Sequence, residues 1–186
     1  MISVKKVQDI LDRSKQIYSK GEVEAFLDKM AEKMNAELKD ANPIMLCVTI
    51  GGIVPLGNLL PRLDFHLEVD YIHLTRYQGK THGGKLVWKA EPSVSLENRN
   101  VVIVDDILDE GITLKTIIDY CYEKGAKKVY SAIMLEKDKE RLIEGVEHAD
   151  FAGVVMEDEF VFGYGLDYDE YLRNVPAIHV VAPEDM

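Results

Sequence analysis

Apolar residues recur at helical spacing through the first forty positions of the chain. The first set predicts a helix with one apolar face, formed by Val4, Val7, Ile10, Leu11, Ser14, Ile17 and Tyr18. Gly21 is expected to end this helix, because glycine disfavours a helix interior. A second set of the same kind, at positions 23–38, predicts another helix, and Asn42-Pro43 then marks a turn.

Continuous apolar runs without alternation predict strands that are buried on both faces, as in parallel sheets. Such runs lie near positions 44, 69, 101, 129, 151 and 178, and helical patterns separate several of them. Strands that alternate with helices indicate a mostly parallel sheet flanked by helices, which is an α/β fold. The 186 residues suffice for one such domain and scarcely for two, so we expect a single domain over 1–186.

The stretch at 75–97 has little periodicity and contains Gly79, Gly83 and Gly84. A structureless run of about twenty residues is uncommon in a compact domain and is usually a lid or a disordered loop. Its residues 86–89 (LVWK) are apolar enough for a short strand. The pattern leaves two alternatives, a two-stranded excursion on the surface or a mobile lid.

The amino-acid composition restricts the possible binding partners more than it restricts the possible folds. The formal net charge of −11 and the pI of about 4.9 argue against binding to nucleic acid or anionic membranes, which require a basic face. They do not exclude an anionic substrate, because local lysines and a metal can bind one. Cys47 and Cys121, without a CxxC motif, indicate buried free thiols in a reducing compartment. With no signal peptide and no membrane-spanning run, we expect a cytoplasmic protein.

The stretch VVIVDDILDEGITL at 101–114 is the most informative part of the chain. A buried strand is followed by Asp105, Asp106 and Asp109 at its carboxyl end, where open α/β sheets bind ligands. The turn that contains Gly111 then leads into a helix N-terminus, which can bind an anion. Carboxylates beside an anion need compensation, usually by a divalent cation or by sugar hydroxyls that face the acids. The alternative is an ordinary acidic surface loop.

This stretch resembles the phosphoribosyl-pyrophosphate (PRPP) signature of type I phosphoribosyltransferases. Two further segments narrow the resemblance, a strand that ends in MLEK at Lys137 and the segment DEFVFGYGLDY at 158–168. Together they are similar to the hypoxanthine-guanine phosphoribosyltransferases over about residues 43–181.

The resemblance implies the type I phosphoribosyltransferase fold, with a mostly parallel central sheet flanked by helices, a flexible flap and a small hood. N-terminal helices occupy 1–42, the mobile flap lies within 75–97, and residues 156–186 form part of the base-binding hood. Arg76 and Tyr77 lie near the start of the flap. Closure of the flap would exclude water, which otherwise hydrolyses PRPP.

On this resemblance, the acids and the turn surround the ribose of PRPP and its phosphate. Asp105 and Asp106 face the ribose hydroxyls, directly or through Mg²⁺. Asp109 lies beside the purine N7 and acts as general base or electrostatic stabiliser. The 5′-phosphate is wrapped by a loop that consists of Asp109, Glu110, Gly111, Ile112 and Thr113.

The resemblance assigns the base and the pyrophosphate to later segments. Lys137 donates to the 6-oxo group of the purine, Phe160 stacks on the base, and backbone groups of Val161 meet its edge. Asp167 holds a second Mg²⁺, and Arg173 contacts pyrophosphate. An ammonium group has donors only, so Lys137 would match a 6-oxo acceptor and reject a 6-amino group.

A strand–Gly-Gly–helix junction lets a backbone come close to a ligand. Here Gly51 and Gly52 directly follow the strand predicted at 44–50. The resemblance makes Ile50-Gly51 part of a pyrophosphate loop, which in this family can carry a non-proline cis peptide.

Two positions depart from the family pattern. Glu110 stands where the loop usually has Thr or Ser, and an ionised carboxylate cannot donate to phosphate. We therefore expect Glu110 to point away, so that only its backbone N–H serves the phosphate. Ile50 stands where Lys or Arg is common, so pyrophosphate binding would depend more on Arg173, the metal and backbone groups.

The expected activity is purine salvage, in which a Mg²⁺-dependent enzyme transfers phosphoribose from PRPP to hypoxanthine or guanine. The resemblance also implies a homodimer or homotetramer. One alternative is a non-catalytic, nucleotide-responsive regulator on the same fold, and another is a transferase that prefers xanthine or a pyrimidine. A phospho-acceptor receiver domain is disfavoured, because about a hundred residues precede the Asp105-Asp106 pair and Asp150 comes before its strand.

Overall fold

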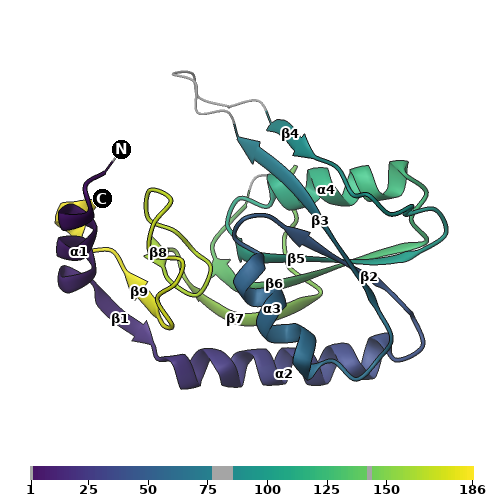
Figure 1. Ribbon diagram of the computed structural model, residues 1–186, viewed down its shortest axis with the longest axis horizontal. Coiled ribbons are helices and arrows are strands. Elements are labelled where there is room, and N and C mark those ends of the chain that lie inside the picture. Colours follow the sequence, from purple (N-terminus) through teal and green to yellow (C-terminus); the bar gives the residue numbers. More distant parts are fainter. Residues whose placement is uncertain (1, 77–85, 142–143) are drawn as a thin grey trace.

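The computed structural model describes residues 2–76, 86–141 and 144–186 (Figure 1). Its central sheet has six strands in the order β4-β3-β2-β5-β6-β7. Their bounds are Ile44–Val48 for β2, Glu68–Arg76 for β3, Leu86–Ala90 for β4, Asn100–Leu108 for β5, Lys128–Asp138 for β6 and Phe151–Glu157 for β7. Every neighbouring pair is parallel except β3 with β4, so the predicted mostly parallel sheet is confirmed.

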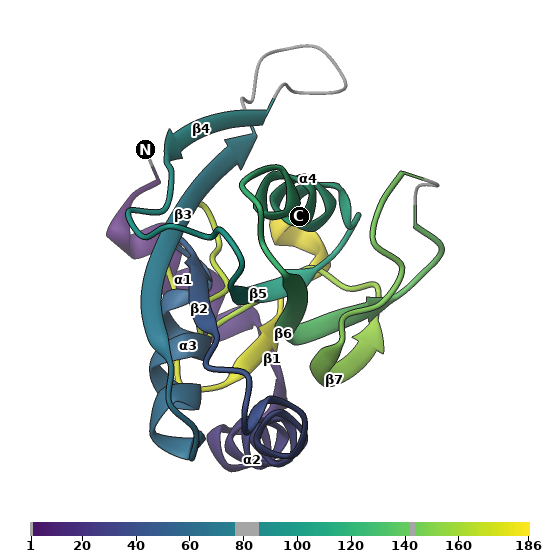
Figure 2. The ribbon, with the colours of Figure 1, turned by 90° about the vertical axis from the view of Figure 1, so that its right-hand side faces the viewer.

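Helices cover both faces of this sheet (Figure 2). One face carries α2 (Lys20–Leu38) and α3 (Ile53–Leu59), which the turn η1 (Leu60–Arg62) extends, and the other carries α4 (Ile112–Glu123). Val102 and Val104 of β5 pack in the core with α2 and α3, whereas Val101 and Ile103 pack with α4. Both faces are buried, which explains the unbroken apolar run. None of the described helices combines the length and the apolar character needed to cross a membrane.

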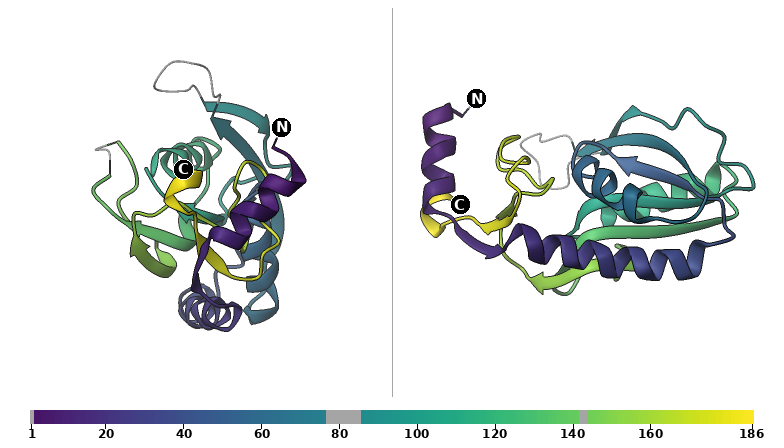
Figure 3. Two further views of the ribbon diagram at one scale, coloured as in Figure 1. Left: turned by 90° about the vertical axis from the view of Figure 1, so that its left-hand side faces the viewer. Right: turned by 60° about the horizontal axis from the view of Figure 1, so that its bottom comes forward.

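A small antiparallel sheet lies at one end of the molecule, with strand order β1-β9-β8. It consists of β1 (Lys15–Tyr18), β8 (Val161–Phe162) and β9 (Ile178–Val180), and α1 (Val4–Arg13) and the turn η2 (Pro183–Asp185) lie beside it. Its apolar cluster contains Val7, Ile10, Phe162, Leu172 and Val181. Arg13 donates to both carboxylate oxygens of Asp185, at 2.9 and 2.6 Å, and α1 and the C-terminal turn lie together (Figure 3).

The first predicted helix is wrong in its extent. It ends at Arg13, and the residues expected to continue it form β1. Gly21 does not end a helix but lies in the first turn of α2. The reason is a capping box, in which the carboxylate of Glu22 accepts a hydrogen bond from the backbone N–H of Ser19 at 2.8 Å. This cap fixes a helix start that apolar spacing does not reveal.

The strand predicted near position 178 exists, but its expected place in the central sheet is wrong. β9 pairs antiparallel with β1 and β8 and belongs to the small sheet. An apolar run predicts burial, and it carries no information about which strand will lie next to it. One of its two partners, β1, comes from the other end of the chain, more than a hundred and fifty residues away.

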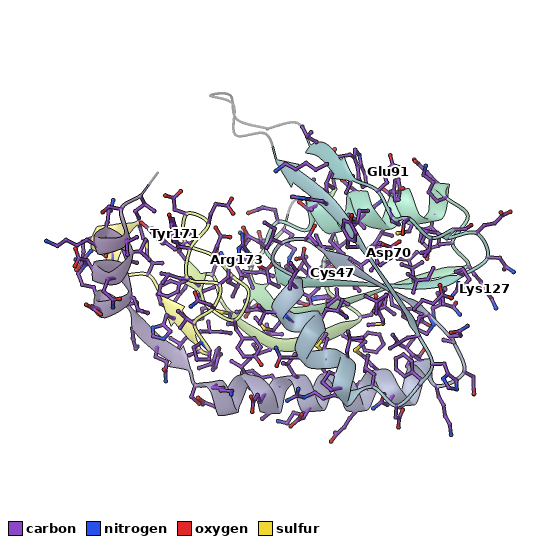
Figure 4. All side chains as sticks on the ribbon, in the orientation of Figure 1. Cys47, Asp70, Glu91, Lys127, Tyr171 and Arg173 are labelled. Atoms are coloured by element: carbon purple, nitrogen blue, oxygen red, sulfur yellow. The ribbon has the colours of Figure 1, made fainter. Side chains whose placement is uncertain are left out.

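The stretch at 75–97 contains β4, which pairs antiparallel with β3 as in the two-stranded alternative. Residues 77–85, on which the lid hypothesis and the Tyr77 contact rest, lie outside the described residues. Beyond β4, the carboxylate of Asp70 accepts hydrogen bonds from the backbone N–H groups of Ser93 at 2.6 Å and Val94 at 2.9 Å. Asp70 therefore fixes the return of the chain to β5 (Figure 4).

Candidate active site

A cavity of about 340 Å³ lies between the carboxyl ends of the central strands and the segment 160–173. The predicted site residues that line it are Gly51, Asp105, Asp106, Asp109, Thr113, Lys137, Phe160, Val161, Asp167 and Arg173. A second cavity of about 320 Å³ follows residues 105–114 and adds Glu110 and Gly111. The fold thus brings together residues from four separate segments of the chain.

Asp105 and Asp106 lie in the last part of β5, which continues to Leu108 beyond the predicted apolar run. Burial raises the pKa of both carboxyl groups, and the adjacent charge of Asp106 raises the pKa of Asp105 further. The guanidinium of Arg173 lies 3.8 Å from Oδ2 of Asp106 and opposes this rise. Two adjacent acids, of which Asp106 is buried and Asp105 half-buried, favour a cation or hydroxyl donors in the cavity.

Gly51 allows the loop after β2 to approach β5 closely. A Cβ atom at this position would overlap the carboxylate of Asp106. A cis peptide bond joins Thr49 to Ile50, one bond before the Ile50-Gly51 bond considered from the sequence. The loop therefore places its backbone directly beside the acids of β5, where a ligand can contact both.

Of the predicted residues that the structure describes in full, three line neither cavity. The side chain of Ile50 is 48% exposed, and Gly52 packs against strand backbone where α3 begins. Ile112 is the first residue of α4. Arg76 ends β3, but its side chain and the whole of Tyr77 lie outside the described part of the chain.

The turn 109–113 connects β5 to α4. Gly111 precedes the first helical residue with a φ of 74°, a left-handed conformation that favours glycine. A Cβ atom there would also overlap the backbone of Val146. No described side chain caps α4, so the N–H groups of its first turn are available to an anion.

Lys137 and Asp109 lie close together at the edge of the cavity. Nζ of Lys137 is 3.4 Å from Oδ1 of Asp109 and donates a hydrogen bond to Asp158 at 2.7 Å, which lowers the pKa of Asp158. Nζ of Lys139 is 2.7 Å from the same oxygen of Asp109. This oxygen is buried between the two ammonium groups, although no hydrogen bond from a described residue to it meets the geometric criteria. The two lysines thus hold the carboxylate of Asp109 at the edge of the cavity.

The segment 160–173 supplies the opposite wall. The ring of Phe160 is 45% exposed and can stack on a planar ligand, and Val161 follows it as the first residue of β8. Nη2 of Arg173 lies 2.7 Å from Oδ1 of Asp167, and Nη1 donates to the carbonyl oxygen of Gly165 at 2.7 Å. Figure 4 shows Arg173 between this segment and the central sheet.

The carboxylates of the cavity fit a metal that a ligand helps to bind. Asp105, Asp106 and Asp167 all line the cavity, but the described acids, histidines and cysteines include no group of three placed to hold a metal. Mg²⁺ is commonly bound by one or two carboxylates together with substrate phosphates. The donor set is therefore suited to Mg²⁺ shared with a phosphorylated ligand.

Sequence reasoning missed Lys139 and Asp158, which contact Asp109 and Lys137. The available signal was the run of charges at 136–139, but Lys139 lies just beyond β6 and the run does not show which carboxylate each lysine meets. The expectation that the side chain of Glu110 points away from the phosphate stays a prediction, but the structure shows where that carboxylate lies. Its Oε1 accepts a hydrogen bond from Lys139 at 2.6 Å.

Known proteins match the chain along most of its length. A family model described as phosphoribosyl transferase domain matches residues 13–169. The hypoxanthine-guanine phosphoribosyltransferase of Streptococcus pneumoniae is 33% identical over 174 residues, which cover 93% of this chain and 96% of that protein. A hypoxanthine phosphoribosyltransferase structure from Staphylococcus aureus superposes with a TM-score of 0.86 at 25% identity, covering 99% of this chain and 98% of that one.

Some relatives are much longer than this chain and match it over only part of their length. The bifunctional protein TilS/HprT of Listeria innocua is 34% identical over 174 residues, which cover 93% of this chain. The match covers 26% of that protein, so the chain spans about a quarter of the length of the first curated relatives it matches.

Proposed function

The chain belongs to the phosphoribosyl transferase domain family, and on that premise we propose that it transfers the 5-phosphoribosyl group of PRPP to hypoxanthine or guanine. The products are IMP or GMP and pyrophosphate, and the reaction is a step of purine salvage. The observation that carries the proposal is one cavity lined by Asp109, Lys137 and Phe160 beside the acids of β5. The type I phosphoribosyltransferase fold supports it.

The ribose and its phosphate are assigned to β5 and to the turn 109–113. Positive charge develops on the ribose carbon as pyrophosphate leaves, and the carboxylates of Asp105 and Asp106 stabilise it. The N–H groups at the start of α4, and the hydroxyl of Thr113, bind the 5′-phosphate. Mg²⁺ bound by Asp105, Asp106 and Asp167 would neutralise charge on the pyrophosphate.

The purine is assigned to the space between Lys137 and Phe160. Phe160 stacks on the ring, backbone groups of Val161 meet its edge, and Lys137 donates to the 6-oxo group. Lys137 now donates to Asp158 at 2.7 Å, so part of that contact is exchanged for the base. The carboxylate of Asp109, which lines the same cavity, accepts the proton at the purine N7 as the new bond forms.

The pyrophosphate is assigned to Arg173 and to the loop after β2. The guanidinium of Arg173 offers donors in a fork that matches phosphate oxygens. Because Ile50 has no polar side chain, the backbone of the loop serves in its place. The remaining contacts are assigned to Gly51, Gly52 and, from the flap, Arg76 and Tyr77.

The enzyme is further proposed to work in the cytoplasm as a homodimer or homotetramer. Cys47 and Cys121 are free and buried, and burial raises the pKa of each thiol to about 12, consistent with a reducing compartment. Size-exclusion chromatography with light scattering gives the number of subunits. A monomer at assay concentration would contradict the oligomer.

The deciding experiment measures nucleotide formation from PRPP and Mg²⁺ with hypoxanthine, guanine, xanthine or adenine offered separately. Product with hypoxanthine or guanine, and none with adenine, is expected. Product with xanthine alone would favour the alternative transferase. No product from folded protein that still binds PRPP would favour a nucleotide-responsive regulator.

A further inference from the structure

We propose that Lys139 is a positioning residue that neutralises Glu110, so that the turn 109–113 binds the phosphate of PRPP although it carries a carboxylate. This inference rests on the proposed function, which seats the 5′-phosphate at this turn. It gives the end of β6 a second role beside that of Lys137.

The ammonium group of Lys139 lies among three carboxylates. Its Nζ is 2.6 Å from Oε1 of Glu110, 2.7 Å from Oδ1 of Asp109 and 3.5 Å from Oδ2 of Asp158. The side chain of Lys139 is 18% exposed and that of Glu110 is 34% exposed, so water screens the pair only in part. Burial lowers the pKa of Lys139, but Asp109 and Glu110 raise it by more, and the group stays charged at ordinary pH.

Lys139 is also the partner on which Glu110 depends. Among the described residues, Glu110 forms its ion pair with Lys139, whereas Lys137 pairs with Asp109 and Asp158. Glu110 lines the second cavity, where the phosphate is proposed to bind. Without Lys139 its charge would repel the phosphate, because like charges a few ångströms apart interact strongly where water is partly excluded.

Strand register places Lys139 level with the turn. β5 and β6 are parallel, and Leu108 of β5 lies opposite Glu136 of β6. The turn 109–113 begins directly after Leu108, and Lys139 lies three residues after Glu136, just beyond the end of β6. The end of β6 and the residue that follows it therefore present two cations to these carboxylates, Lys137 to Asp158 and Lys139 to Glu110.

The test measures the affinity for ribose 5-phosphate by calorimetry and the KM for PRPP by steady-state kinetics. K139M should weaken ribose 5-phosphate binding and raise the KM for PRPP by about tenfold each, because it leaves Glu110 uncompensated. The affinity for ribose 5-phosphate is the readout for Glu110, because kcat also reports on Asp109, whose Oδ1 lies 2.7 Å from Nζ of Lys139. K139R keeps the charge and should retain most of the affinity.

The second arm removes the repelling charge. E110Q alone should strengthen ribose 5-phosphate binding, and E110Q added to K139M should reverse most of the loss. A purely structural role for Lys139 predicts no such reversal. K128M is the matched control, because it removes an exposed lysine at the other end of β6 that pairs with Glu37 at 3.7 Å. It should leave binding unchanged.

Unchanged binding by K139M, or a loss that E110Q does not reverse, would overturn the inference. If K139M fails to fold, the exchanged variant E110K/K139E replaces it, with near-normal affinity expected and a tenfold loss counting against the pair. Wild-type protein that binds ribose 5-phosphate and shows this mutational pattern, but forms no nucleotide, would reject the proposed function and keep the pair. Nucleotide formation without this mutational pattern would support the proposed function and reject the role of the pair. The absence of both binding and turnover would reject the proposed function and the role of the pair together.

Discussion

Asp109 has a buried carboxylate oxygen that accepts no hydrogen bond from the described residues, and two lysines lie nearby. Asp109→Asn keeps the size but removes the charge and the basicity. We expect kcat with hypoxanthine to fall about 10²–10⁴-fold, the range typical of a lost acid–base group. The side chain is 45% exposed, so the Tm should change little. Asp119→Asn, an exposed acid on α4, is the control, and near-normal turnover of D109N would remove Asp109 from this role.

Lys137 is expected to set the choice between 6-oxo and 6-amino purines. Lys137→Ala removes the donor to the 6-oxo group and should raise the KM for hypoxanthine by about tenfold or more. Discrimination against adenine should narrow at the same time. Lys127→Ala, which removes an exposed lysine just before β6, serves as the control (Figure 4). Kinetics with both bases give the ratio of kcat/KM, and an unchanged ratio would reject the assignment.

The site residues that could be predicted from the sequence are those that lie close together in one short motif. The acids of β5 and Gly111 form one short motif, and the structure places them around the two cavities. Lys139 was not predictable, because its contact with Glu110 depends on the register of β6 against β5. A sequence shows a run of charges there, and only the paired strands show which carboxylate each lysine meets.

Asp70 joins β3 to the segment that follows β4. Its carboxylate accepts hydrogen bonds from the backbone N–H groups of Tyr71, Ser93 and Val94 and from the hydroxyl of Ser93. Burial acts to raise the pKa of Asp70, but these donors outweigh it, and the pKa lies below the ordinary value. The stability that the carboxylate contributes is therefore present above the unfolded-state pKa of about 3.9 and is lost as the pH falls through the folded-state pKa.

Asp70→Asn should lower the free energy of unfolding at neutral pH by about 1–3 kcal/mol, because an amide cannot accept all of these hydrogen bonds. The difference from the wild type should shrink below about pH 4, where the carboxyl group is protonated on unfolding. Urea unfolding at neutral and acidic pH checks both statements. Glu32→Gln, at an exposed site of α2, should show neither effect, and a deficit that does not vary with pH would contradict the explanation.

The helices and strands could be predicted from the sequence where burial of apolar residues determines their position. The five strands β2, β3, β5, β6 and β7 follow apolar runs, because each is covered on one or both faces. β1 was missed because its residues also fit a helical spacing, and the caps that separate α1 from α2 are single serines. Residues 86–89 were ambiguous alone, and pairing with β3 decides their conformation.

The cavity itself is a property of the whole molecule. Its walls come from the carboxyl edge of the central sheet and from the segment 160–173, which the small sheet holds in place. β1 and β9 belong to opposite ends of the chain, and the hydrophobic periodicity of the sequence does not predict that they pair. The expectation that 1–186 is one domain therefore depends on how firmly the small sheet is coupled to the central one.

Ile10 tests that coupling. It is fully buried in the small cluster with Val7, Phe162, Leu172 and Val181. Ile10→Ala should cost about 2–5 kcal/mol locally, and we expect this to loosen the small sheet before the central sheet. Phe160 and Arg173 lie on the loosened segment, so the KM for hypoxanthine should rise several-fold.

Leu27→Ala is the matched control, because Leu27 is equally buried but belongs to the core between α2 and the central sheet. Its cost should be similar, with little change in the KM of the molecules that remain folded. Hydrogen exchange read by mass spectrometry separates the two variants. Ile10→Ala should speed exchange in β8 and β9 while β5 stays protected, whereas Leu27→Ala should speed exchange in the central strands. Equal acceleration of both sheets by Ile10→Ala would mean that they open only together, and that the wall formed by 160–173 cannot loosen independently of the acids of β5.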